Sequence, residues 1–192
     1  MLLHVYVDTF QLGDWGSSPL HIGMDIPLTL VGNPGSTLGV GAAPLNCYLS
    51  NRGKVRLVRT GLAEYAFCGR IIEVKRDEPM GKLVYQEVLI DCGVPIIFAT
   101  DGYPGFVPIL DLDDPGNKES SPGRYLSGLM LLDAHISYRR EPVLIEQEVR
   151  ARLTSLATVD LLPDAKTLAG LLEMQSVDSL SAKLPLIMGI EV

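Results

Sequence analysis

Residues 67–100 read FCGRIIEVKRDEPMGKLVYQEVLIDCGVPIIFAT, and this stretch decides the class of the fold. Its first part, Phe67–Lys75, and its later part, Leu83–Ile90, both contain several Val and Ile residues, which are typical of β-strands. The polar turn Arg76–Lys82 between them holds a proline and a glycine. We therefore predict a long β-hairpin in a chain built mainly from strands.

Further strand-like runs lie on both sides of this hairpin. Leu2–Asp8 and Ile26–Val31 come before it, and Tyr125–Tyr138 comes after it. The runs Leu45–Leu49 and Lys54–Thr60 predict a second, short hairpin. The order of elements is thus mostly strands, which favours a β-dominated domain.

The second half of the chain contains three segments of a different kind. Residues 101–123 are rich in Pro and Gly and predict a long loop, either functional or disordered. Val143–Leu161 alternates apolar and polar residues with period two, which favours a strand, although its apolar residues also recur at helical spacing. Pro163–Met174 predicts a helix with Asp164 as its N-cap and an apolar stripe.

Composition sets limits on the class of protein. The 192 residues are 47% hydrophobic and 20% charged, with a net charge of -7, as in an ordinary soluble globular domain. No run of about 18 apolar residues predicts a membrane span, and the N-terminus does not read as a signal peptide. The three cysteines, Cys47, Cys68 and Cys92, form no CxxC pair and no complete disulfide framework, so we expect a cytoplasmic protein.

Three fragments carry a resemblance to a known fold: CGRIIEV (68–74), VLIDCGVPI (88–96) and PGRYLSGLMLLDAHI (122–136). Through them, residues 67–162 resemble a small OB-like Greek-key β-barrel. The resemblance implies that the fragments are its first three strands, bent at Gly69 and Gly128, and that oligonucleotides or oligosaccharides bind on strands two and three.

The predicted fold class is therefore mainly β, a β-dominated α+β arrangement. We expect a β-rich domain over residues 1–162, with the OB-like core at about 55–162 behind an N-terminal β-rich extension. Residues 163–192 are expected to form a helical C-terminal segment packed on that domain.

Charge is distributed unevenly along the chain. Residues 1–51 sum to -3, residues 52–82 to +4 and residues 83–192 to -8, which gives the total of -7. The basic island predicts a local anion site, and aromatic residues near it could stack on a ligand. The candidate binding residues are the bases Arg52, Lys54, Arg56, Arg59 and Arg70, the aromatics Tyr85 and Tyr125, and Trp15 as an interface anchor.

The sequence contains no motif typical of catalysis, metal binding or cofactor binding. The Gly-rich run 32–41 has no Walker signature, and its best dinucleotide match has a proline in place of the third glycine. The acidic loop 111–117 departs from a calcium loop at Pro115, and the histidines lack zinc spacing. We therefore expect no catalytic residues, no metal and no cofactor.

Three functional hypotheses remain. The first is a non-enzymatic binding or assembly module whose partner is a protein, including a second copy of the chain. The second is an OB-like binder of single-stranded nucleic acid that uses residues 52–82, although the net acidity disfavours it. The third is an enzyme of unrecognised type, which requires Asp91, Asp133 and His135 to converge in one pocket.

Overall fold

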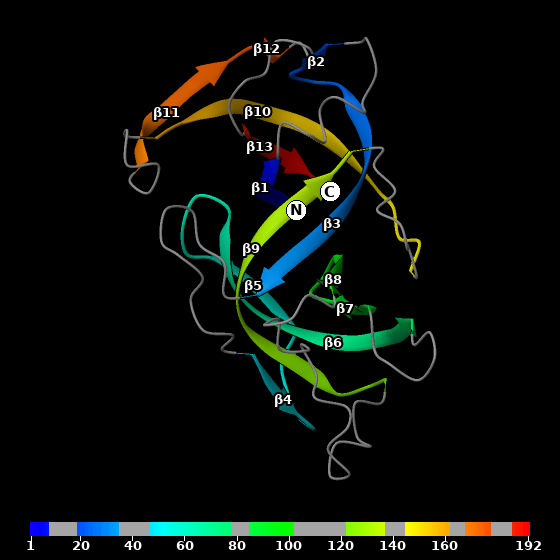
Figure 1. The fold of residues 1–192 in the computed structure, drawn as a ribbon. Coiled ribbons are helices and arrows are strands. Elements are labelled where there is room, and N and C mark those ends of the chain that lie inside the picture. Colours follow the sequence, from blue (N-terminus) through cyan, green and yellow to red (C-terminus); the bar gives the residue numbers. More distant parts are fainter. Residues whose placement is uncertain are drawn as a thin grey trace.

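The computed structural model describes residues 1–7, 19–34, 47–77, 85–101, 122–136, 145–161, 168–177 and 186–192 (Figure 1). The regular secondary structure in these ranges consists of β-strands. They are β1 (Leu2–Val7), β2 (Leu20–His21), β3 (Asp25–Pro34), β4 (Tyr48–Ser50), β5 (Arg56–Arg59), β6 (Glu64–Asp77), β7 (Tyr85–Asp91), β8 (Pro95–Asp101), β9 (Tyr125–His135), β10 (Val149–Leu161), β11 (Leu168–Met174), β12 (Ser176–Val177) and β13 (Leu186–Glu191).

Eight strands form a closed β-barrel in the order β10, β13, β1, β9, β6, β7, β8, β3 and back to β10. β3 and β9 also pair with each other, Thr29–Pro34 against Met130–His135, across the middle of this circuit. The shared β3–β9 pair divides the circuit into two five-stranded rings, one above and one below it in Figure 1. β2 and β12 form a separate small pair.

The two rings follow the same strand pattern. From β9, the lower ring runs through β6, β7 and β8 by antiparallel pairs and closes on β3 by a parallel bridge between Val31 and Ile97. From β3, the upper ring runs through β10, β13 and β1 by antiparallel pairs and closes on β9 by a parallel bridge between Tyr6 and Asp133. Val31 and Asp133 face each other, so an approximate two-fold axis passes between them.

Two local details repeat under this pseudo-symmetry. The β6–β7 register shifts at Ile72 and the β10–β13 register shifts at Thr154, so the corresponding pair of strands in each ring contains a β-bulge. The turn from β7 to β8 has its counterpart where residues 192 and 1 meet. Cys92 N–H donates to the Val94 carbonyl at 3.0 Å, and Val192 N–H donates to the Met1 carbonyl at 3.0 Å.

The core follows from the alternation of side chains along each strand. On β6, Tyr65, Phe67 and Ile71 point inward and are buried, while Ala66, Cys68 and Arg70 point outward. The Phe67 and Phe98 rings lie 5.1 Å apart at the centre of the lower ring. One main hydrophobic cluster joins strands of both rings, so the two rings share a core.

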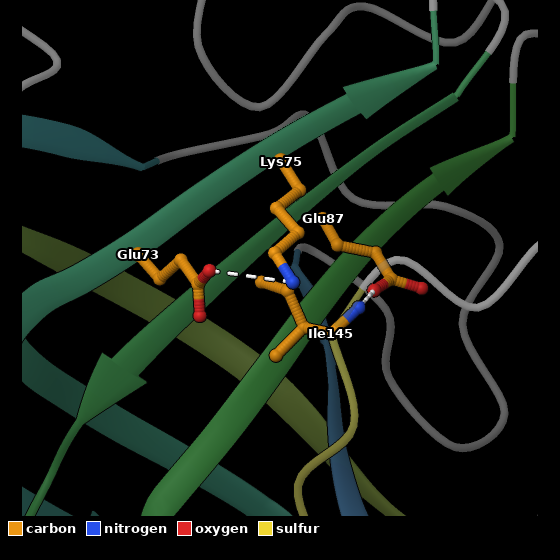
Figure 2. A network of polar contacts seen from close by, with 4 residues as sticks. All are labelled: Glu73, Lys75, Glu87 and Ile145. Atoms are coloured by element: carbon orange, nitrogen blue, oxygen red, sulfur yellow. Dashed lines mark hydrogen bonds and ion pairs between the residues drawn. The ribbon is translucent and has the colours of Figure 1, made fainter.

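A segment outside the sheet covers β7 and β8. Ile145 packs with Leu89 and Ile97 in a small separate cluster. Figure 2 shows how it is held: the Glu87 Oε2 atom accepts a hydrogen bond from the Ile145 N–H at 2.5 Å. Lys75 on the neighbouring strand forms an ion pair with Glu73 at 3.4 Å. Glu87 is 4% exposed, so this hydrogen bond lies in a dry environment.

The predicted β-dominated barrel is confirmed. The predicted fold class is nevertheless wrong, because it combined an OB-like core with a helical C-terminal segment. The closed circuit contains eight strands and runs from β1 to β13. Leu168–Met174 is strand β11, paired with Leu156–Leu161 of β10, because pairing in a sheet outweighs a local helical preference. The described residues contain no helix, and Asp164 lies outside them.

Two smaller predictions also have an outcome. The strand interpretation of residues 143–161 is confirmed for Val149–Leu161. The predicted hairpin between residues 45–49 and 54–60 is wrong, because β4 pairs with β9 and β5 pairs with β6. Most of the predicted loop 101–123 lies outside the described residues.

None of the described residues form a helix with the length and apolar character needed to cross a membrane.

Candidate functional site

The connection from β4 to β5 crosses one face of the sheet. β4 and β6 both pair with β9 near Tyr125, so they lie on opposite edges of β9. β5 lies on the far edge of β6, which gives the local order β4, β9, β6, β5. Residues 51–55 therefore span about 14 Å, three strand spacings, over the sheet. We call residues 51–55 the strap.

Gly53 is where the strap touches the sheet. A Cβ atom at this position would lie 2.7 Å from Cγ of Tyr125 and 2.9 Å from Sγ of Cys68. Only a glycine permits so close an approach of the backbone. The strap starts with a hydrogen bond from the Ser50 hydroxyl to the Arg52 carbonyl at 2.8 Å. It therefore covers Cys68 and one side of the Tyr125 ring.

We call the side of β5, β6 and β9 that points away from the core the outer face. It carries Arg56 and Val58 of β5, Ala66, Cys68 and Arg70 of β6, and Tyr125, Ser127 and Leu129 of β9. Their neighbours in sequence on β6 and β9, such as Phe67, Leu126 and Met130, are buried in the core.

Basic side chains gather on and around the outer face. Arg56 and Arg70 stand on its strands, and Arg52 and Lys54 flank Gly53 on the strap. All four are exposed, and none forms an ion pair with another residue in the part of the chain that the structure describes. Within the described ranges, their charges are therefore available to an anionic ligand.

An apolar row crosses the centre of the outer face. Val58 pairs with Ala66, and Ala66 pairs with Leu129, so the three side chains stand side by side on three neighbouring strands. Val58 is 53% exposed and Leu129 is 50% exposed. Large apolar side chains that stay half exposed in adjacent positions form a patch suited to burial against a partner.

Arg59 belongs to a different environment from the other bases. It alternates with Val58 and lies next to Tyr65, whose hydroxyl accepts from the His4 N–H at 2.7 Å and donates to the His4 carbonyl at 3.2 Å. Burial lowers the pKa of His4 below 6.5, and the positive charge of Arg59 lowers this pKa further. Burial raises the pKa of Tyr65.

The predicted site residues are thus brought together only in part. Arg52, Lys54, Arg56, Arg70 and Tyr125 share the outer face and its strap. Arg59 is exposed nearby on the other side of β5. The backbone of Tyr85 begins β7, but its side chain lies outside the described part, as does the whole of Trp15.

Sequence reasoning missed the apolar part of this face. Val58, Leu129 and the 65% exposed Tyr48 were not predicted as binding residues. Leu129 carried a signal, since it occupies an outward position in the alternation of β9. Gly53 carried none, because its role depends on which edges β4 and β5 occupy.

The polar residues considered for catalysis do not converge. Asp91 ends β7 opposite Arg70, at the level of Tyr125. Asp133 lies farther along β9, about 26 Å from Tyr125 at about 3.3 Å per residue, and His135 lies beyond it. The Asp91 carboxylate accepts from the Gly93 N–H at 2.8 Å, whereas the Asp133 carboxylate accepts from the Asn33 amide at 2.5 Å.

Cys47 and Cys92 do not have the properties of activated nucleophiles. Burial, with a smaller effect of Asp91 and Cys68, raises the pKa of Cys92 to about 12. Burial raises the pKa of Cys47 to about 11. A nucleophilic thiol requires a lowered pKa, so neither residue has the environment of a catalytic cysteine.

In comparisons with known proteins, no family model, no curated protein and no solved structure matches this chain. The geometry and charge of the outer face are therefore the features that point to a function.

Proposed function

We propose that this protein is a non-enzymatic binding module that holds an acidic protein partner on the outer face. The observation that carries the proposal is the apolar row Val58–Ala66–Leu129, bordered by cations that have no described ion-pair partner. Apolar contact at the centre and charge at the rim is the usual anatomy of a protein interface. The proposed setting is the cytoplasm, where the three free cysteines stay reduced.

Single-stranded nucleic acid is the second candidate ligand, because the same cations would contact phosphates. Two observations favour a protein. Bases stack on exposed aromatic rings, but the strap covers one side of Tyr125. Covering the exposed Val58 and Leu129 side chains with apolar groups lowers the free energy of the complex, and a phosphate backbone does not provide such groups.

The experiment compares two dye-labelled probes by fluorescence anisotropy. One is a soluble peptide of alternating Glu and Leu, and the other is a short oligo-dT strand. We expect the peptide to bind more tightly at physiological salt, and we expect Leu129→Ser to weaken peptide binding severalfold. Arg56→Ala and Arg70→Ala should each weaken binding and reduce its salt dependence.

The matched control is Lys75→Ala. Lys75 is also an exposed base on β6, but it lies beyond the part of β6 that pairs with β5 and β9, and it forms an ion pair with Glu73. Its replacement should leave peptide binding unchanged. Tighter binding of oligo-dT, insensitive to Leu129→Ser, would replace the protein partner with nucleic acid. Equal losses in all the variants, including Lys75→Ala, would show attraction by net charge and not a site.

A further inference from the structure

The edge of β5 that faces away from β6 indicates how the proposed binding module holds its partner. The inference drawn from this edge rests on the proposed function. β5 pairs with β6 and stands at one end of the strand order. In an antiparallel pair, residues alternate between those bonded to the partner strand and those whose backbone groups point away. The Thr60 N–H donates to the Glu64 carbonyl at 2.8 Å, which fixes this alternation for the whole pair.

Counting back two residues at a time from Thr60, Val58 and Arg56 also bond to β6. The N–H and carbonyl groups of Leu57 and Arg59 then point away from β6. No residue in the described ranges makes a hydrogen bond to these groups. Among the described residues, β5 therefore offers two sets of backbone donors and acceptors along an edge that no strand occupies, which is the starting point for adding a strand.

The side chains of β5 define which strand would fit. Arg56 and Arg59 bracket Leu57 and Val58, and both arginines are exposed. Neither is in an ion pair with a described residue. A neighbouring strand would place one residue beside each of these four. Charge complementarity then requires acidic residues beside the two arginines and apolar residues beside Leu57 and Val58.

We infer that the acidic partner docks by adding an extended segment with the pattern acidic, apolar, apolar, acidic to the edge of β5. The pattern is the same in both chain directions, so it suits a parallel or an antiparallel strand. The apolar residue beside Val58 extends the row Val58–Ala66–Leu129 by one strand. The arginines also repel a basic strand, so the edge selects its partner by charge.

The test uses the peptide acetyl-Thr-Glu-Val-Val-Glu-Thr-amide with the full 192-residue chain, followed by amide hydrogen exchange in NMR. We expect the exchange of the Leu57 and Arg59 amides to slow by about tenfold or more at saturation. The amides of Arg56 and Val58 already bond to β6, so their rates should change little. A peptide with Lys in place of Glu and a peptide of order Thr-Val-Glu-Glu-Val-Thr should bind at least about tenfold more weakly.

A pair of variants tests the backbone contribution. Leu57→Pro removes the N–H that points to the open edge and leaves the bonds of residues 56 and 58 to β6. Leu57→Ala removes the same side-chain contacts but keeps the N–H. We expect Leu57→Pro to abolish peptide binding. In Leu57→Ala, the bound peptide should still slow the hydrogen exchange of the Arg59 amide. The exchange rates of core amides such as Ile90 report whether each variant is folded.

The outcomes separate this inference from the proposed function. If both acidic peptides bind equally, require Leu129, and leave the Leu57 and Arg59 exchange rates unchanged, strand addition is wrong and the outer-face module stands. If neither these peptides nor the alternating Glu-Leu peptide binds, the proposed function itself is overturned. The exchange measurement on the unaltered chain decides the question even if Leu57→Pro does not fold.

Discussion

Gly53 shows how one residue without a side chain determines the layout of a binding face. Its backbone lies directly on Tyr125 and Cys68, so the strap rests on the sheet and holds Arg52 and Lys54 above it. A raised strap would move both charges away from Arg56 and Arg70. The arrangement of cations therefore depends on a steric contact as well as on the positions of the arginines.

Gly53→Ala should destabilise the protein by about 1–3 kcal/mol and expose Cys68. The added methyl group would overlap Tyr125 and Cys68, and relief requires a shift of the strap. Chemical denaturation measures the stability, and alkylation followed by mass spectrometry measures the access to Cys68. Asn51→Ala, an exposed change in the same strap, is the control. Unchanged stability together with an unchanged Cys68 labelling rate would contradict the close packing of the strap.

His4 should make the stability sensitive to mild acid. Its pKa in the folded protein is lowered below 6.5, chiefly by burial and then by Arg59, so the unfolded chain binds more protons as the pH falls below 6.5. The contribution of His4 is fully present above pH 6.5 and is lost progressively towards the lower, folded-state pKa. Urea unfolding at a series of pH values should show this loss. His4→Gln should make the profile flatter, and an identical slope in the variant would argue against His4 as the cause.

At the scale of elements, alternation of side chains predicted most strands correctly, because one face of each strand meets the core. β6 and β9 have this pattern throughout much of their length, and β10 has it despite its helix-like spacing. β11 escaped prediction because its Leu, Ala, Glu and Met residues favour a helix when taken alone. Its conformation is set by pairing with β10, an interaction that lies outside its own sequence.

Glu87 connects two elements, since it fixes residues 145–148 over β7 and β8. Glu87→Ala should destabilise the protein by about 1–3 kcal/mol, because it leaves the Ile145 N–H without its acceptor in a buried place. Glu87→Gln keeps an acceptor oxygen and should cost less. Denaturant unfolding of both variants checks this order. A Gln variant that is less stable than the Ala variant would show that the hydrogen bond to Ile145 is not the dominant role of Glu87.

At the scale of the whole molecule, closure was the least predictable property. In the upper ring, β13 lies between β1 and β10. The pairing of β1 with β13 brings the first and last described residues together. Local patterns identify strands but do not determine which strands pair. For the same reason, the basic island predicted Arg56 and Arg70, whereas the apolar row emerged only once β5, β6 and β9 were neighbours.

The meeting of Val192 and Met1 predicts a tolerated circular permutant. Cys92 and Val94 make the same hydrogen bond around Gly93, whose φ is +90°. Linking Val192 to Met1 through one glycine and opening the chain at Gly93 should therefore give a folded protein with stability within about 1 kcal/mol of the original. Circular dichroism and urea unfolding test this. A permutant opened at Ile71 is the control, because it interrupts the paired part of β6 and should not fold.

Because β3 and β9 belong to both rings and one hydrophobic core joins the strands of both, the unfolding of one ring removes packing from the other. Heating should consequently melt the sheet in one cooperative step, with equal calorimetric and van't Hoff enthalpies, and not as two successive transitions. A ligand held on the lower ring alone would then raise the melting temperature of the upper ring as well. Binding at one end of the molecule would be visible in the heat resistance of the other.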